Sequence, residues 1–216
     1  MILNYDYENN YSRNLLVKQE QGALFIVSGP SGVGKTTVVT EFLKQHHQDY
    51  QVSRMVTYTT KTPRSTEVHG IDYHFITQLE FEQKVAEGFF LEWSCEYGAC
   101  YGTPKHVLNE ISIGKSYVLV IDRVGAAQIV EKYPYAVLIW IQVSSIEILS
   151  NRLNLRKTDS FDQIQARLFL AKKEIEQELT IPMYHHYIMN DDLKTSVERV
   201  SEIVLPRCFS FKRDII

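Results

Sequence analysis

Three short apolar runs stand out along the chain and are separated by longer amphipathic segments. They cover residues 23–28 (ALFIVS), 117–121 (YVLVI) and 136–143 (AVLIWIQV). Each run is continuously apolar instead of alternating with polar residues, which is typical of strands buried on both faces of a parallel sheet. We therefore predict three buried strands of one mainly parallel sheet.

The amphipathic segments between and after these runs predict helices. The first begins at Gly34 and runs to about His46. The next is expected to open at Thr103-Pro104, a capping residue followed by a proline of the first turn, and to close at Gly114. Strands that alternate with helices indicate an α/β fold with helices flanking the sheet.

Two more helices are predicted in the last third of the chain. One covers residues 160–179 and opens with a capping box of Ser160 and Gln163, and the other starts at about Asp192. Apolar residues at helical spacing mark one buried face on each: Ile164, Leu168, Ala171, Ile175 and Leu179 on the first, and Leu193, Val197, Val200 and Val204 on the second.

Composition narrows the possible classes of function. The 216 residues are 44% hydrophobic and 23% charged, enough for one sizeable core, and the net charge of −3 argues against a large nucleic-acid surface. No apolar run reaches membrane-spanning length, and residues 1–21 are polar and lack the apolar core of a secretory signal. The three cysteines, an odd and sparse set, favour reduced thiols in the cytoplasm over a disulfide framework or a zinc site: Cys95, Cys100 and Cys208.

A phosphate-binding motif follows the first predicted strand. Residues 29–36 read GPSGVGKT and match G-x-x-x-x-G-K-[ST], with Gly29, Pro30, Ser31, Gly32, Val33, Gly34, Lys35 and Thr36 in order. The glycines allow a tight turn whose N–H groups face phosphate oxygens. Lys35 provides a charge for the β- and γ-phosphates, and Thr36 a hydroxyl for Mg²⁺. The motif predicts binding of a nucleoside triphosphate but does not identify the acceptor.

Two later segments indicate the acceptor. Residues 59–75 read TTKTPRSTEVHGIDYHF, and residues 89–104 read FFLEWSCEYGACYGTP. In this order after such a phosphate loop, they resemble the GMP-binding lobe of guanylate kinases. The resemblance runs from about Gly22 to Leu205 and includes Ile121-Asp122, residues 152–159 and the NDDL sequence at 190–193. It implies a P-loop kinase fold with an inserted GMP-binding lobe and an arginine-bearing lid.

By this resemblance, the acceptor phosphate is gripped by Arg64, Tyr73 and Tyr101, with Lys61 standing where the family usually has a second arginine. Guanidinium forks and phenols are suitable donors for a doubly charged phosphate. Thr57, Gly102 and Thr103 would assist at the base or the adjoining sugar-phosphate, and Asp122 is placed near the guanine and the reacting centre.

Glu92 would read the base. Guanine presents N1–H and an exocyclic amino group side by side, and a carboxylate accepts both. Adenine has a lone pair at N1, so it would leave a buried Glu92 facing another acceptor, a mismatch that gives strong discrimination. The expected acceptors are therefore GMP and dGMP.

The lid is expected over about residues 152–170. Arg152 and Arg156 are four residues apart, so they share a helix face, and Arg167 comes from the next helix. Phosphoryl transfer needs alignment, charge neutralisation and exclusion of water, which converging arginines supply. Asn190 is assigned to the ATP site by the resemblance. A solvated charged helix is the alternative interpretation of the arginines.

The predicted organisation is an N-terminal extension (1–21), a guanylate kinase-like domain (22–205) and a C-terminal tail (206–216). Within the domain lie the phosphate loop (29–36) and the lobe (about 53–103), whose Thr, Tyr and charge break the α/β rhythm. The expected reaction is Mg²⁺-dependent transfer from ATP to GMP by a cytoplasmic monomer or homodimer without nucleic-acid or membrane partners.

Five positions depart from the family pattern. Lys61 lacks the arginine fork, Val120 replaces a carboxylate, and Val124 replaces a glutamine, while Thr66 and Lys157 stand where glycine is common. The changes at Lys61, Val120 and Val124 keep open the alternative of a catalytically weakened guanylate-kinase-like binding module. A separate alternative is a P-loop kinase with another phosphorylated acceptor, such as a sugar phosphate (a ribose phosphate), against which Glu92 and the Tyr73/Tyr101 pair argue.

Overall fold

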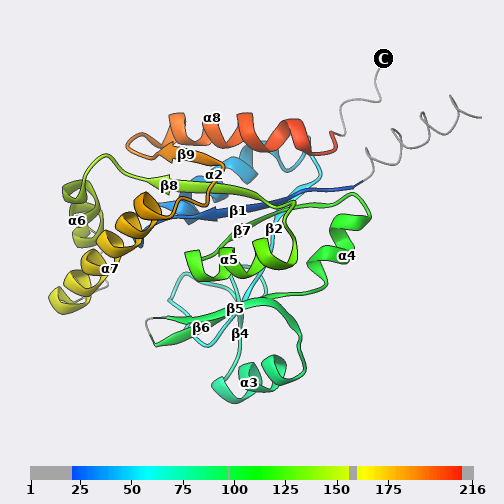
Figure 1. Ribbon diagram of the computed structural model, residues 1–216, viewed down its shortest axis with the longest axis horizontal. Coiled ribbons are helices and arrows are strands. Elements are labelled where there is room, and N and C mark those ends of the chain that lie inside the picture. Colours follow the sequence, from blue (N-terminus) through cyan, green and yellow to red (C-terminus); the bar gives the residue numbers. More distant parts are fainter. Residues whose placement is uncertain (1–20, 97, 156–159, 211–216) are drawn as a thin grey trace, which may run out of the picture.

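The computed structural model describes residues 21–96, 98–155 and 160–210, and its centre is a five-stranded parallel sheet (Figure 1). The strand order is β2-β7-β1-β8-β9. β1 (Leu24–Ser28) pairs in parallel with β7 (Ser116–Val120) and β8 (Val137–Gln142). β2 (Val52–Arg54) and β9 (His186–Met189) form the two edges, also in parallel register. The three apolar runs are thus the three central strands, as predicted.

Both faces of this sheet are covered, which explains why the central strands are continuously apolar. Phe25 and Val27 of β1 pack under α2 (Lys35–His46) and α8 (Leu193–Val204) in one buried cluster. Leu24 and Ile26 point the other way, into a cluster shared with α4 (Val107–Ser112) and α5 (Arg123–Lys132). Figure 1 shows α2 and α8 on one side of the sheet and α4 and α5 on the other.

A second, four-stranded sheet lies beyond α5 (Figure 1). Its order is β4-β3-β6-β5, with β4 at His74–Phe75, β3 at Tyr58–Thr59, β6 at Ala99–Pro104 and β5 at Phe90–Glu96. β5 and β6 form an antiparallel hairpin, and α3 (Gln78–Ala86) closes a small core around Phe81, Phe90 and Cys100. This sheet is built from the segment that breaks the α/β rhythm of the sequence.

Two helices, α6 (Ile146–Leu155) and α7 (Phe161–Thr180), project from the end of the central sheet. The capping box predicted for α7 is present, with Ser160 and Gln163 bonded reciprocally. Ile164 and Ala171 are buried as expected, but Leu179 is 79% exposed. The helix end extends beyond the apolar core, and the residue buried there is Glu178, paired with Arg123. A short 3-10 helix, η1 (Leu205–Arg207), follows α8.

One predicted helix start is wrong. Thr103 and Pro104 are the last residues of β6, and α4 begins only at Val107 and ends at Ser112, before Gly114. Pairing across the hairpin, Thr103 with Glu92 and Pro104 with Phe90, extends the strand through the expected cap. Tertiary strand pairing therefore overrides a local capping signal.

The expectation of three reduced thiols is also wrong for this structure. Cys95 and Cys100 form a disulfide, and only Cys208, which is buried, is free. The two cysteines are directly opposite each other in the β5–β6 hairpin, with Cα atoms 4.0 Å apart. Opposed residues of an antiparallel pair bring their Cβ atoms close enough for a bridge. The hairpin register, which the cysteine spacing alone does not reveal, creates this pair.

No helix within the described ranges is both long and apolar enough to cross a membrane.

Candidate active site

The phosphate loop connects the central strand β1 to α2, the context that the motif requires. Gly34 caps the helix with φ 97°, a left-handed conformation that favours glycine. A Cβ on Gly29 would lie 1.9 Å from the carbonyl oxygen of Ile141, so the neighbouring strand leaves no room for a side chain. The Lys35 ammonium donates to the carbonyl oxygens of Gly29 and Pro30 at 2.6 and 3.0 Å. The lysine is thus held over its own loop, beside the N-terminus of α2.

A hollow of about 270 Å³ adjoins the loop. It is lined by Gly32, Gly34, Thr37, Arg152, Leu155, Asn190 and Leu193. Asn190 is buried, and its Nδ2 donates to the Val33 carbonyl at 2.7 Å. Its Oδ1 has no hydrogen-bond partner among the described residues. This amide oxygen is therefore an unpartnered hydrogen-bond acceptor in a residue that lines the hollow.

Arg152 lies on α6 against the main chain of the loop. Its guanidinium donates to the carbonyl oxygens of Val33 at 3.1 Å and of Asn190 at 2.7 Å. In this structure the side chain therefore ties α6 to the phosphate loop and to the end of β9. Of the other predicted lid arginines, Arg167 lies on α7, partly exposed, and Arg156 falls outside the described residues. Their convergence on phosphates stays a prediction.

The predicted acceptor-phosphate residues come together in the second sheet and its loops. The rings of Tyr73 and Tyr101 are 6.0 Å apart, and the Lys61 ammonium lies 4.9 Å from the centre of the Tyr73 ring. Lys61 also bonds both carboxylate oxygens of Glu67, at 2.5 and 2.8 Å. Arg64 is more exposed, with its Nη1 4.0 Å from Glu67. Lys61 and Arg64 thus share one carboxylate partner.

Two pKa shifts follow from this cluster. Partial burial raises the pKa of Glu67, but hydrogen bonds from the Arg64 backbone N–H and the Lys61 ammonium outweigh burial and lower it below its usual value. Burial, with the neighbouring Tyr73, raises the pKa of Tyr101. Tyr101 therefore remains a protonated phenol, able to donate a hydrogen bond to a phosphate oxygen.

Arg54 is a cation of this cluster that the sequence analysis did not identify. It ends β2, and its guanidinium lies 5.4 Å from the centre of the Tyr73 ring and 4.0 Å from an Asp72 oxygen. Its side chain is mostly buried. Because β2 is a three-residue strand in a polar segment, the sequence offered no periodic pattern that would have marked it.

Glu92 is a buried carboxylate on β5, with 1% of its surface exposed. The Thr103 hydroxyl, directly opposite on β6, donates to its Oε1 at 2.5 Å. Burial raises the pKa of Glu92 to about 7, the Thr103 hydrogen bond opposes this shift, and the Asp122 charge adds to it. A carboxylate with this pKa changes charge near neutrality, which is the behaviour of functional groups more often than of structural ones.

Asp122 lies beside Glu92 and is the N-cap of α5. Its Oδ1 accepts from the Gly125 backbone N–H at 2.7 Å, and its Oδ2 accepts a short hydrogen bond from the Ser94 hydroxyl. Ser94, on β5, is a second site residue that sequence reasoning missed, since a serine in an apolar strand is usually unremarked. Of the two remaining predicted residues, Thr57 is buried just before β3, and Gly102 lies in β6 opposite Trp93.

The sheet register places the two halves of the site next to each other. Val27 of β1 is paired with Val120 of β7, and the Ile121 N–H donates to the Val27 carbonyl at 3.2 Å. The phosphate loop and Asp122 therefore leave the carboxyl ends of adjacent parallel strands, the edge where α/β sheets bind ligands. Two departures from the family pattern also lie here, Val120 at the end of β7 and Val124 exposed on the first turn of α5.

This fold and site define a P-loop phosphotransferase with a second site that combines cations, phenols and a buried carboxylate. The family model for guanylate kinase matches residues 21–206. The chain therefore belongs to the guanylate kinase family.

Individual relatives support this family membership. The guanylate kinase of Geobacter metallireducens is 41% identical over 197 residues, which cover 90% of this chain and 94% of the relative. That of Gloeobacter violaceus is 40% identical over 182 residues, covering 84% and 86%. The crystal structure of guanylate kinase from Anaplasma phagocytophilum superposes with a TM-score of 0.71 at 28% identity and 87% coverage of each chain.

Proposed function

We propose that the protein transfers the γ-phosphoryl group of ATP to GMP and gives ADP and GDP. The single observation that carries the choice of acceptor is the buried Glu92, which is held by Thr103 beside Asp122. Glu92 lies in the same four-stranded sheet as Tyr101 of the cation and phenol cluster. Family membership and the relatives named above support the same activity. No observation favours the binding-module or sugar-phosphate alternatives.

Base recognition follows from the chemistry of Glu92. In its charged form, the carboxylate accepts from guanine N1–H and the exocyclic amino group, and the Thr103 hydroxyl fixes one oxygen while it does so. Two donors on the ligand compensate for the burial that raises the pKa of the free side chain. We expect dGMP to serve equally, because the assigned residues read the base and the phosphate.

Acceptor positioning is assigned to the cluster of Arg54, Lys61, Arg64, Tyr73 and Tyr101. Their cationic and phenolic donors neutralise and orient the GMP phosphate so that one oxygen faces the transferring group. Phosphoryl transfer is accelerated mainly by such alignment and charge stabilisation, without a covalent enzyme intermediate.

On the donor side, Lys35 and the N-terminus of α2 stabilise the ATP phosphates, and the hollow next to Asn190 receives the adenine. We expect Mg²⁺ to arrive with ATP. The exposed Thr36 hydroxyl at the start of α2 fits a hard cation whose other ligands are phosphate oxygens and water. The ion would neutralise charge on the phosphates. We assign Arg152, Arg156 and Arg167 to closing the site around them.

We further propose that the protein's partners are ATP and GMP or dGMP, and that it works in the cytoplasm as a monomer or homodimer. A coupled assay of ADP release tests the proposal, with MgATP and GMP, dGMP, AMP, CMP or UMP in turn and Lys35→Ala as the control. Turnover confined to GMP and dGMP, and lost in Lys35→Ala, is expected. Turnover with AMP or the pyrimidine nucleotides at a similar rate would contradict the assignment of Glu92.

A further inference from the structure

The strand that carries Glu92 is an edge strand. β5 is the last strand in the order β4-β3-β6-β5, so one row of its backbone N–H and C=O groups has no strand partner. Exposed edges of this kind bind water or shift register unless another element covers them. In this protein the covering element is α5, the helix whose N-cap is Asp122.

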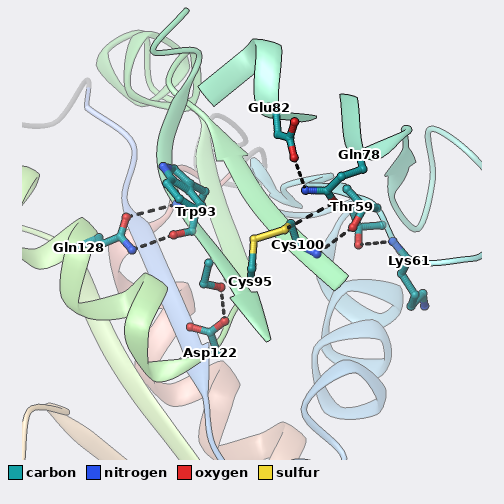
Figure 2. Close-up of a disulfide and its surroundings, with 11 residues drawn as sticks. Thr59, Lys61, Gln78, Glu82, Trp93, Cys95, Cys100, Asp122 and Gln128 are labelled. Carbon is teal, nitrogen blue, oxygen red and sulfur yellow. Dashed lines mark hydrogen bonds between the residues drawn. A yellow bond between two sulfur atoms is a disulfide. The ribbon is translucent and has the colours of Figure 1, made fainter. Parts of the chain in front are cut away.

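The side chain of Gln128 takes the place of a neighbouring strand. Its Oε1 accepts from the Trp93 backbone N–H at 3.2 Å, and its Nε2 donates to the Trp93 carbonyl at 2.8 Å (Figure 2). One side-chain amide thus satisfies both main-chain groups of the residue that follows Glu92. An amide is the side-chain group that both donates and accepts in this way.

Two more hydrogen bonds connect β5 to α5 and its N-cap, one on each side of the Gln128–Trp93 bonds. The Lys132 ammonium donates to the Leu91 carbonyl at 2.6 Å, and the Ser94 hydroxyl donates to Asp122. Residues 91, 93 and 94 are therefore each tied to α5. Glu92 lies between them, so its main chain is fixed relative to the helix.

The helix and the Glu92 carboxylate are also in close contact. A Cβ built on Gly125, in the first turn of α5, would be 2.5 Å from Glu92 Oε2. The position of the carboxylate is thus set by the spacing between β5 and α5, and a shift of the strand by a fraction of a residue would move it. Misplacement of a recognition group by about 1 Å is enough to cost a large factor in binding or rate.

We propose that Gln128 is a positioning residue that determines guanine selectivity by fixing the edge strand β5, and with it Glu92, against α5. The inference rests on the proposed function, since it takes Glu92 to be the group that reads the base. Gln128 does not touch the nucleotide in this account. It acts only through the main chain of Trp93.

The test compares two nucleotides that differ at one group read by Glu92. IMP lacks the exocyclic amino group of GMP, so it makes one hydrogen bond to Glu92 where GMP makes two. Gln128→Met keeps a side chain of similar length but removes both bonds to Trp93. We expect the dissociation constant for GMP, measured by titration calorimetry, to rise about tenfold and that for IMP to rise much less, because a hydrogen bond to a charged group is lost only with GMP.

Three further variants separate positioning from general destabilisation. Gln128→Glu still accepts from the Trp93 N–H but cannot donate to its carbonyl, so its preference for GMP over IMP should be intermediate. Lys132→Met removes the neighbouring contact at Leu91 and should shift the preference in the same direction. Gln45→Met is the matched control, because Gln45 is an exposed α2 amide bonded to Glu41 of its own helix. It should leave both dissociation constants unchanged.

The outcomes are distinguishable. Equal weakening of GMP and IMP in Gln128→Met, or no weakening, would overturn the positioning role while the wild type still binds and phosphorylates GMP. If Gln128→Met does not fold, Gln128→Glu and Lys132→Met carry the same comparison. A wild-type protein that binds GMP no better than AMP would overturn both the proposed function and this inference.

Discussion

The hydroxyl of Thr103 donates a 2.5 Å hydrogen bond to the buried carboxylate of Glu92 across the β5–β6 pair. This contact connects the second sheet to the chemistry of the site, because it orients a charge-bearing group that burial would otherwise favour in its neutral form. It also places the carboxylate next to Asp122, at the end of the strand adjacent to the phosphate loop.

Binding of GMP is predicted to strengthen as pH rises through neutrality. Burial raises the pKa of Glu92 to about 7, so in the free protein the side chain is mostly protonated at pH 6 and mostly charged at pH 8. The charged form accepts the two guanine donors, so the dissociation constant should fall about tenfold over this range. Calorimetric titrations with GMP at several pH values measure this. The phosphate of GMP also titrates near pH 6, and Glu92→Gln isolates the contribution of the carboxylate: its profile should lack the step at pH 7.

Replacing Lys61 with arginine is predicted to lower the Michaelis constant for GMP severalfold. Lys61 already lies in the acceptor cluster, bonded to Glu67 and over the Tyr73 ring. A guanidinium in its place offers a bidentate fork to phosphate where the ammonium offers a point charge. Steady-state rates at varied GMP and saturating MgATP measure the effect. An unchanged or higher Michaelis constant would contradict this account of Lys61.

Asn190→Ala is predicted to weaken the donor site and leave the acceptor site intact. The variant removes the buried bond to the Val33 carbonyl and the unpartnered amide oxygen of a residue that lines the hollow beside the loop. We expect the Michaelis constant for ATP to rise about tenfold, because the hydrogen bond proposed between the adenine amino group and the Asn190 amide is lost. The Michaelis constant for GMP should stay unchanged. A change in the Michaelis constant for GMP alone would show that the hollow does not receive the adenine.

The Cys95–Cys100 disulfide is predicted to stabilise the hairpin that carries Glu92 and Thr103. In the chain-entropy model, the bridge restricts the unfolded chain and so raises its free energy relative to the folded state. For so short a loop this stabilisation is about 2 kcal/mol. Urea unfolding with and without a reductant measures this difference, and the double variant Cys95→Ser, Cys100→Ser should behave like the reduced protein in both conditions. Thiol titration of the denatured, unreduced protein should find one reactive group, Cys208. Three reactive thiols would contradict the pairing.

The central sheet and the phosphate loop could be predicted from the sequence because their signals are local. The buried strands are continuous apolar runs, and the loop is a contiguous motif between a strand and a helix. The capping box of α7 is equally local, with Ser160 and Gln163 three residues apart. Such features are decided by neighbours in the chain, so they are visible before any tertiary contact is known.

The rest of the site depends on pairing between distant segments. Arg54 reaches Tyr73, and Ser94 reaches Asp122, across contacts that no spacing rule indicates. The misplaced helix start at Thr103 and the unexpected disulfide have the same origin, since both follow from the register of β5 against β6. The resemblance to guanylate kinases named Glu92, but its burial, its Thr103 partner and its raised pKa come only from the fold.

The most direct test of the account is the identity of the product formed by the wild type and by Glu92→Gln. Both proteins would be incubated with MgATP and either GMP or AMP, and the nucleotides separated by ion-exchange chromatography. The account predicts that the wild type forms GDP from GMP and almost no additional ADP from AMP. It also predicts that Glu92→Gln loses about a hundredfold or more in kcat/KM for GMP, since its amide presents a donor to the guanine donors. If the Glu92→Gln variant forms GDP as efficiently as the wild type, the assignment of Glu92 as the group that selects the acceptor is contradicted.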